Sequence, residues 1–320
     1  MAGSKASRVD QMETLRRYSA AILLAIMIIL NLIITPNFFS IGTLWNVITQ
    51  SCTIILTGMG MTMVISTGGI DISVGAVMAL SGMVSVKMLS YGVVPAIIAA
   101  LLVCLVSGLI AGFMVGKLRV QSMVVTLALM IGVRGVAQIL NDAKILYMDT
   151  SANADMYKML GSYKIGGLFP IQLIPIVLSV VVVYFILEKT ILGRHIQATG
   201  DNPNSATLAG INTGKTLMFV YMSSAFLAAL AGVFATAKIG AADGNSLGEL
   251  AELDAIAAVA VGGTSMSGGR ARVFGSVIGA LIMQLITIMV NMNNITYEYA
   301  QVFKAIIIIV AVYIQREKVS

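Results

Sequence analysis

Charged residues are scarce in this sequence of 320 amino acids. Only 11% of the residues are Asp, Glu, Lys or Arg, whereas 58% are hydrophobic. A soluble protein of this length needs a polar coat over its core. So little charge excludes such a coat and therefore a soluble protein. The mean hydropathy of +0.95 points the same way. We therefore expect that the solvent of most of the chain is lipid.

Residues that bind metals or carry catalysis are also few. His195 is the single histidine, which excludes a histidine cluster around a metal, and neither Cys52 nor Cys104 has a second ligand nearby. Both cysteines fall in apolar runs, which predicts small packing residues rather than a disulfide. No arrangement of nucleophile, acid and base stands out. We expect no metal, no cofactor and no enzymatic reaction in this chain.

Apolar runs long enough to cross a bilayer recur along the whole sequence. A hydrocarbon core about 30 Å thick takes roughly 20 helical residues. The sequence thus predicts an all-α, polytopic transmembrane bundle of about ten spans, forming one domain over residues 1–320. The candidate spans are 18–35, 46–66, 74–90, 94–115, 120–140, 170–187, 217–238, 251–264, 273–292 and 300–314.

Lys and Arg are distributed unevenly between the two sides of these spans. With the N-terminus in the cytoplasm, the inside segments hold Lys5, Arg8, Arg16, Arg17, Lys117, Arg119, Lys189, Arg194, Lys215, Arg270, Arg272, Arg316 and Lys318. The outside segments hold only Lys87, Lys144, Lys158, Lys164 and Lys238. Cytoplasmic loops are enriched in basic residues, so both termini, the tail 1–17 and the long segment 188–216 are predicted to be cytoplasmic. This enrichment also explains the net charge of +6 without a nucleic-acid partner.

Two spans carry stripes of polar residues at helical spacing. One helix face of the second span holds Asn46, Gln50, Thr53 and Thr57, and one face of the ninth holds Gln284, Thr287, Asn291 and Asn294. Amides and hydroxyls in hydrocarbon need partners, so both faces are expected to point inward. Two interpretations are open. The stripes are hydrogen-bonded links between helices, or they line an uncharged path for a polyhydroxylated solute.

Small residues and embedded charges each allow two interpretations as well. Gly108, Gly112 and Gly116 recur at four-residue spacing, as do Gly275 and Gly279, and such spacing favours close helix packing within one chain or between subunits. The charges that fall in or near spans are Arg134, Lys304, Asp71, Glu252 and Asp254. We favour anchoring or ion pairing for them over an ion relay, because no central carboxylate cluster is present.

The inside segment 188–216 contains two further patterns. Residues Ala209–Thr216 are similar to a phosphate-binding loop, but Ala209 stands where the pattern needs glycine and no buried strand precedes it, so no ATP site is expected here. Asp201 or Asn202 is expected to cap a short helix through Ala206 to Leu208, with Pro203 at its first position. The alternative is a plain connector.

Three stretches together resemble a known family. They are the motif Gly58–Gly75, the inside stretch Gly193–Ile211, and the motif Gly262–Arg270 followed by Gly275 and Gly279. The two motifs also echo each other as G-G-x-x-apolar-S-x-G, which is a possible trace of an internal repeat. In order and spacing, the three stretches are similar to the permease subunit of bacterial ABC importers for sugars of the ribose, galactose and xylose type. The resemblance extends from about Phe39 to the C-terminus.

The resemblance implies a function and partners. A multi-pass permease in the bacterial inner membrane would carry a monosaccharide from periplasm to cytoplasm as a homodimer, with a periplasmic sugar-binding protein and a cytoplasmic ATP-binding subunit that holds ATP and Mg²⁺. The ATPase-coupling residues would be Gly193, Arg194, Gly200, Asp201, Asn202, Ser205, Ala206, Gly210 and Ile211. The motif residues are Gly68, Gly69, Asp71, Ser73, Gly75, Gly262, Gly263, Ser267 and Gly269. The alternatives are an ion-coupled secondary transporter of a small polar solute and a membrane-embedded enzyme.

Overall fold

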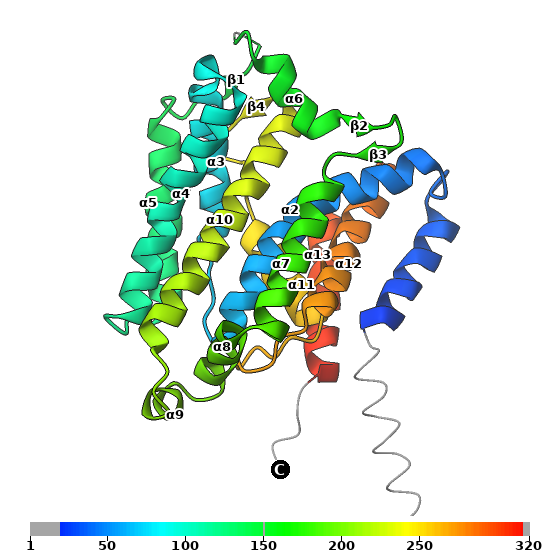
Figure 1. Cartoon of the computed structure of the whole chain (residues 1–320). Helices are drawn as coiled ribbons and strands as arrows, with labels where there is room; N and C mark the ends of the chain where they lie inside the picture. The colour runs from blue at the N-terminus through cyan, green and yellow to red at the C-terminus, as the bar shows by residue number, and fades with distance from the viewer. Residues whose placement is uncertain (1–19, 150, 316–320) are drawn as a thin grey trace, which may run out of the picture.

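The computed structural model describes residues 20–149 and 151–315, which form a helical bundle (Figure 1). A helix lies at each of the ten segments predicted from apolar runs. The predicted cytoplasmic tail 1–17 lies outside the described residues. The ten helices are Ala20–Ile34, α2 (Ile41–Ser66), α3 (Val74–Lys87), α4 (Val93–Gly116), α5 (Ser122–Ile139), α7 (Leu173–Lys189), α10 (Thr213–Ile239), α11 (Ala251–Val261), α12 (Val273–Met292) and α13 (Tyr297–Gln315).

Short elements connect these helices. The 3-10 turn η1 (Leu89–Tyr91) and α6 (Ala154–Ser162) lie at one end of the bundle, and α8 (Ile191–Asp201) and α9 (Pro203–Leu208) lie at the other (Figure 1). Two-residue strands form two antiparallel pairs: β1 (Leu146–Tyr147) with β4 (Ala241–Ala242), and β2 (Lys164–Ile165) with β3 (Phe169–Pro170). The fold is therefore all-α apart from these short pairs.

The helices differ in whether they can cross a membrane alone. Five described helices, α2, α4, α5, α10 and α12, are long and apolar enough. Helices α7 and α8 pass the same test only when taken together, and a bend of 73° separates them. The helix Ala20–Ile34 and α3 are apolar but shorter. The chain is thus a polytopic helical membrane protein, while the count of ten spans and the cytoplasmic side remain predictions.

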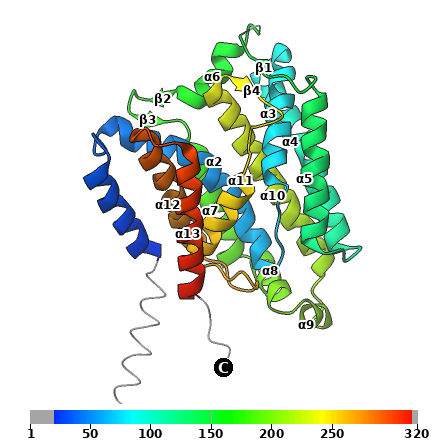
Figure 2. The same cartoon turned by 180° about the vertical axis from the view of Figure 1, so that it is seen from behind.

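The described chain begins and ends at the same end of the bundle. The helix Ala20–Ile34 starts, and α13 finishes, toward the end that carries α8 and α9 (Figures 1 and 2). The predicted loop 188–216 is consequently on the same side as the two ends of the described chain.

Helices α2 and α10 form the centre of the bundle, and α5 lies at its edge. Of the apolar windows of these helices, 78% is buried in α2 and 56% in α10, but only 22% in α5. On α4, a Cβ added at Gly112 would lie 2.6 Å from Met218 Cα of α10, and one at Gly108 would lie 2.7 Å from Ala225 Cβ. Glycine at these positions lets α4 and α10 approach backbone to backbone. The interpretation of the glycine spacing as packing within one chain is confirmed here.

Candidate functional site

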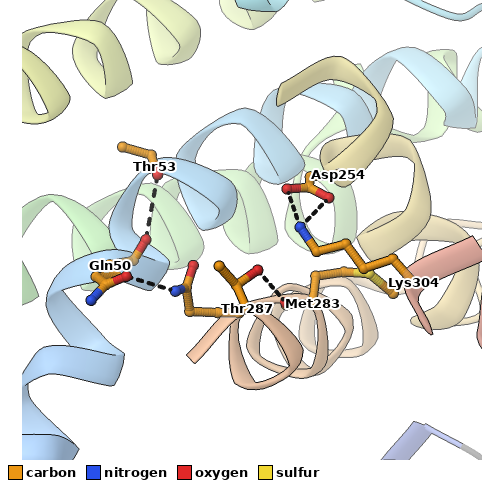
Figure 3. A network of polar contacts seen from close by, with 7 residues as sticks. Gln50, Thr53, Asp254, Met283, Thr287 and Lys304 are labelled. Carbon is orange, nitrogen blue, oxygen red and sulfur yellow. Dashed lines mark hydrogen bonds and ion pairs between the residues drawn. The ribbon is translucent and has the colours of Figure 1, made fainter. Parts of the chain in front are cut away.

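Both predicted polar stripes contribute to the lining of one cavity of about 370 Å³. Gln50, Thr53 and Thr57 reach it from α2, and Gln284 and Thr287 reach it from α12. The Gln284 Nε2 donates a hydrogen bond to Gln50 Oε1 at 3.1 Å, which joins the stripes directly (Figure 3). The inward orientation of these five side chains follows from the cost of leaving polar groups in lipid.

The outer members of the stripes lie elsewhere. Asn46 and Asn291 are exposed and are not among the residues that line the cavity. Asn46 Oδ1 accepts a hydrogen bond from Gln50 Nε2 at 2.8 Å, so Asn46 still orients a cavity residue from outside. The structure therefore brings five of the seven candidate path residues together and leaves two at the periphery.

Charged side chains also line the cavity, which the stripe pattern did not predict. They are Lys238, Glu249, Asp254 and Lys304, so two cations and two anions face the same space. The expectation of an uncharged lining is wrong in this respect. Glu249 and Asp254 reach the cavity from the short helix α11 and the turn before it, and Lys238 and Lys304 reach it from the long helices α10 and α13.

Lys304 and Asp254 form an ion pair within this lining. Lys304 Nζ lies 2.9 Å from Asp254 Oδ1 and 2.8 Å from Oδ2, joining α13 to α11 (Figure 3). The prediction that embedded charges serve anchoring or pairing is confirmed for Lys304. It also agrees with Arg134 of α5, whose Nη1 donates to the backbone carbonyls of Asn245 and Leu247 at 3.2 and 2.6 Å.

Helices α3 and α11 both begin inside the bundle. Helix α3 has 14 residues and α11 has 11, so they extend only about 21 and 16 Å, too little to cross a bilayer. Their N-terminal ends meet: a Cβ at Gly75 would collide with the Gly248 carbonyl and lie 2.5 Å from Glu252 Oε2. Discontinuous helices that meet within the membrane are typical of transporter binding sites.

Asp71 holds the extended segment that precedes α3. This carboxylate is 2% exposed, and its Oδ1 accepts hydrogen bonds from Ser73 N at 3.0 Å and Ser73 Oγ at 2.6 Å. Its Oδ2 accepts from Ser224 Oγ of α10 at 2.8 Å. A buried carboxylate is stable only when such donors surround it. Asp71 and Ser73 of the first motif thereby fix where α3 begins.

The two glycine motifs converge on the end of α8. The Gly269 N–H donates to the Ser66 carbonyl at 3.0 Å, linking the loop after α11 to the end of α2. Gly200 of α8 packs against both partners, because a Cβ there would lie 2.6 Å from Gly269 N and closer still to Ser66 O. Gly68 faces the carbonyls of Ser267 and Gly200. Gly262 and Gly263 do not contact Gly200; Gly262 packs against Gly275, and Gly263 packs against Arg272.

The segment 188–216, predicted as a loop, contains the helices α8 and α9, and the single residue Asn202 joins them. Asn202 caps α9, since its Oδ1 accepts hydrogen bonds from the N–H groups of Asn204 and Ser205 at 3.0 Å each, and Pro203 begins the helix. The prediction of a capped helix is confirmed, and Asn202 rather than Asp201 is the cap. Helix α9 ends at Leu208, whose side chain is 90% exposed.

The other predicted coupling residues differ in their exposure to solvent. Gly193 is buried against the last carbonyls of α7, and Ala206 is buried on the inner side of α9. Arg194, Asp201, Ser205 and Gly210 are exposed, and Ile211 is half-buried. Sequence reasoning did not select Leu208. An apolar side chain at the tip of a polar, capped helix is the signal that would have identified it.

No metal site is found among the described residues 20–149 and 151–315, where no group of three His, Cys, Asp or Glu side chains comes together. Cys52 and Cys104 are both buried and are not bonded to each other. Cys52 lines the cavity beside Lys238.

Comparisons with known proteins extend over almost the whole chain. The chain is 39% identical over 297 residues to the ribose import permease protein RbsC of Haemophilus influenzae, covering 91% of this chain and 90% of the relative. It is 34% identical to the galactofuranose transporter permease protein YtfT of Escherichia coli, covering 92% and 88%. It is 35% identical to the fructose import permease protein FruF of Bifidobacterium longum, covering 87% and 78%.

No solved structure matches the chain significantly. The sequence profile described as branched-chain amino acid transport system / permease component matches residues 43–312. That match includes both glycine motifs, the cavity lining from Gln50 to Lys304, and the helices α8 and α9. The chain therefore belongs to the permease component family of the branched-chain amino acid transport systems.

Proposed function

We propose that the chain is the membrane permease subunit of an ATP-driven ABC importer in the bacterial inner membrane. It moves a monosaccharide of the ribose type from the periplasm to the cytoplasm. The observation that carries this proposal is the cavity between α2, α10, α11, α12 and α13, where amides, hydroxyls and balanced charges lie among apolar side chains. The printed functions of the relatives, ribose, galactofuranose and fructose import, all concern neutral sugars.

ATP hydrolysis is assigned to a separate subunit that holds ATP and Mg²⁺, so this chain is not an enzyme. Residues 209–216 run from the end of α9 into α10 without a strand before them. A phosphate-binding loop requires that strand and a glycine at position 209. These features argue only against nucleotide binding at 209–216, and the absence of any other cofactor is part of the proposal.

The α8–α9 unit is proposed to receive the movement of the ATPase. Leu208 offers an apolar side chain at the tip, and Asn202 keeps α9 rigid by satisfying its first N–H groups. Gly200 places the unit against the loops that lead to α3 and from α11. A push on α9 would therefore reach the loops beside α3 and α11 through the backbone contacts of Gly200. Two arrangements of these short helices would then open the cavity to alternate faces.

The remaining partners follow from the same proposal. A second copy of the chain would form a homodimer, and a periplasmic sugar-binding protein would deliver the solute to the end opposite α8 and α9. Lipid surrounds the apolar side chains that α4, α5 and α7 expose, such as Leu102, Ile131 and Val181. No nucleic acid is involved.

A crosslinking experiment tests the docking of α9. With Cys52 and Cys104 replaced by alanine, a cysteine at Asn202 should crosslink to a cysteine in the cognate ATPase, and nucleotide should change the yield. Leu208→Asp should weaken ATPase binding roughly tenfold or more, since burying a leucine contributes about 1.5–3 kcal/mol. Thr207→Asp is the matched control, because Thr207 is also an exposed residue of α9. Ile131→Asp on α5 is not a matched control, because Ile131 faces lipid. Equal binding by wild type and Leu208→Asp would contradict the assignment.

A further inference from the structure

The ion pair between Lys304 and Asp254 lies inside the cavity rather than at a span end. Both residues line the cavity, and their side chains are 7% and 20% exposed. Figure 3 shows Asp254 and Lys304 together and apart from Gln50, whose amide oxygen accepts the hydrogen bond from Gln284. Ionisable groups within a membrane protein usually face a water-filled cavity and take part in its function.

Stability alone does not account for this pair. Removing two charges from water is costly, and well-packed apolar residues at such positions are often as stable or more stable. The pair also joins α13 to a half-helix, α11, which α12 already packs against. The arrangement is explained better by what Asp254 offers to the cavity.

Asp254 has acceptor capacity beyond its contacts with Lys304. A carboxylate offers about four lone-pair positions, and the Lys304 ammonium occupies one on each oxygen. The remaining positions can accept two neighbouring O–H groups. Hydrogen bonds to a charged acceptor are stronger than neutral ones, and two parallel bonds fix the orientation of the solute.

We propose that Asp254 is the residue that selects the solute, by accepting hydrogen bonds from two adjacent hydroxyls of a neutral monosaccharide. Lys304 positions the carboxylate and balances its charge. This inference rests on the proposed function and adds a specific subsite to it.

The rest of the lining fits a neutral polyol rather than an ion. Lys238 and Glu249 are the other charged side chains around the cavity, so its formal charge is balanced. The amides of Gln50 and Gln284 supply both donors and acceptors on the opposite wall. A volume of about 370 Å³ is at the small end of ligand pockets, as a single sugar requires.

The experiment uses the full-length chain in lipid nanodiscs. Thr49→Cys, in a background with Cys52→Ala and Cys104→Ala, reports access to the cavity, because Thr49 lines it. The rate of alkylation by a water-soluble maleimide is measured with increasing D-ribose, D-fructose or D-galactofuranose. We expect at least one of these sugars to slow alkylation. Asp254→Asn should raise the required sugar concentration roughly tenfold or more.

Two matched variants separate selection from structure. Asp155→Asn removes an exposed carboxylate on α6 and should leave protection unchanged. Asp254→Lys combined with Lys304→Asp keeps an ion pair but moves the carboxylate to α13, and it should not restore protection. A deoxy analogue of the protecting sugar that lacks one of the two hydroxyls should protect poorly, because a site built to bond a hydroxyl rejects its absence.

The outcomes test the role of Asp254 separately from the proposed function of sugar import. Protection that is equal in Asp254→Asn and wild type, or restored by the exchanged pair, overturns the role of Asp254 and leaves sugar import standing. Protection by none of the three sugars in the parent protein overturns both the cavity as a sugar path and the subsite.

Discussion

Replacing Gly200 by alanine tests whether α8 is coupled to the two glycine motifs. The added Cβ would lie 2.6 Å from Gly269 N and nearer still to the Ser66 carbonyl, where carbon contacts normally settle at about 3.5 Å. Helix α8 must therefore withdraw by roughly 1 Å to relieve the contact with Gly269 N, and by more to relieve the contact with the Ser66 carbonyl. Overpacking of this kind costs about 1–3 kcal/mol. Loss of the Gly269–Ser66 hydrogen bond, now 3.0 Å long, adds about 1 kcal/mol.

The assay compares ATP hydrolysis with sugar uptake in proteoliposomes that contain the ATPase and the binding protein. Gly200→Ala should lower uptake about tenfold or more, while ATPase activity falls much less. The reason is that the substitution changes the contact of α8 with the two glycine motifs and leaves the ATPase subunit unchanged. Gly132→Ala is the matched control: it lies on α5 with nothing within 4 Å of its added Cβ, and alanine favours the helix. Normal uptake by Gly200→Ala, at normal expression, would refute the coupling through this junction.

Three further predictions address single contacts. Asn202→Ala should speed amide exchange in residues 204–208 roughly fivefold, since the cap contributes about 1 kcal/mol; unchanged exchange would show that α9 does not depend on it. Gln50→Leu and Gln284→Leu should each impair uptake without loss of assembly. Uptake is measured by transport assay and assembly by size-exclusion chromatography. Normal uptake by both variants would show that these residues do not belong to the translocation path. Gly112→Leu should lower the melting temperature, because the new side chain would clash with Met218 of α10 at an overpacking cost of about 1–3 kcal/mol. Gly135→Leu, where the added side chain faces open space, should leave the melting temperature unchanged.

Most of the helical organisation could be predicted from apolar runs, because a helix in lipid must be apolar along its whole length. The interruptions could not be predicted in the same way. The sequence around Asp71 and around Gly248 is as compatible with a continuous helix and turn as with an extended segment inside the bundle. Only the contacts of Asp71 with Ser224, and of Gly75 with Gly248, decide where α3 and α11 begin.

The candidate site was partly predictable for a similar reason. Helical spacing shows which residues share a face, so Gln50 and Gln284 were selected as inward-facing. Spacing within one helix says nothing about which other helix supplies the opposite wall. The pairing of Asp254 with Lys304, 50 residues apart in sequence, and the convergence of Gly200 with Ser66 and Gly269 depend on tertiary packing alone.

The central claim is that this chain forms a gate and that its energy comes from a separate ATPase. The most direct measurement is accumulation of radiolabelled D-ribose, D-fructose and D-galactofuranose in sealed proteoliposomes, with the chain alone or with its ATPase and binding protein. Our account predicts accumulation of at least one sugar only in the complete assembly with ATP, and none from a proton or sodium gradient. Steady accumulation by the chain alone under either gradient would contradict it.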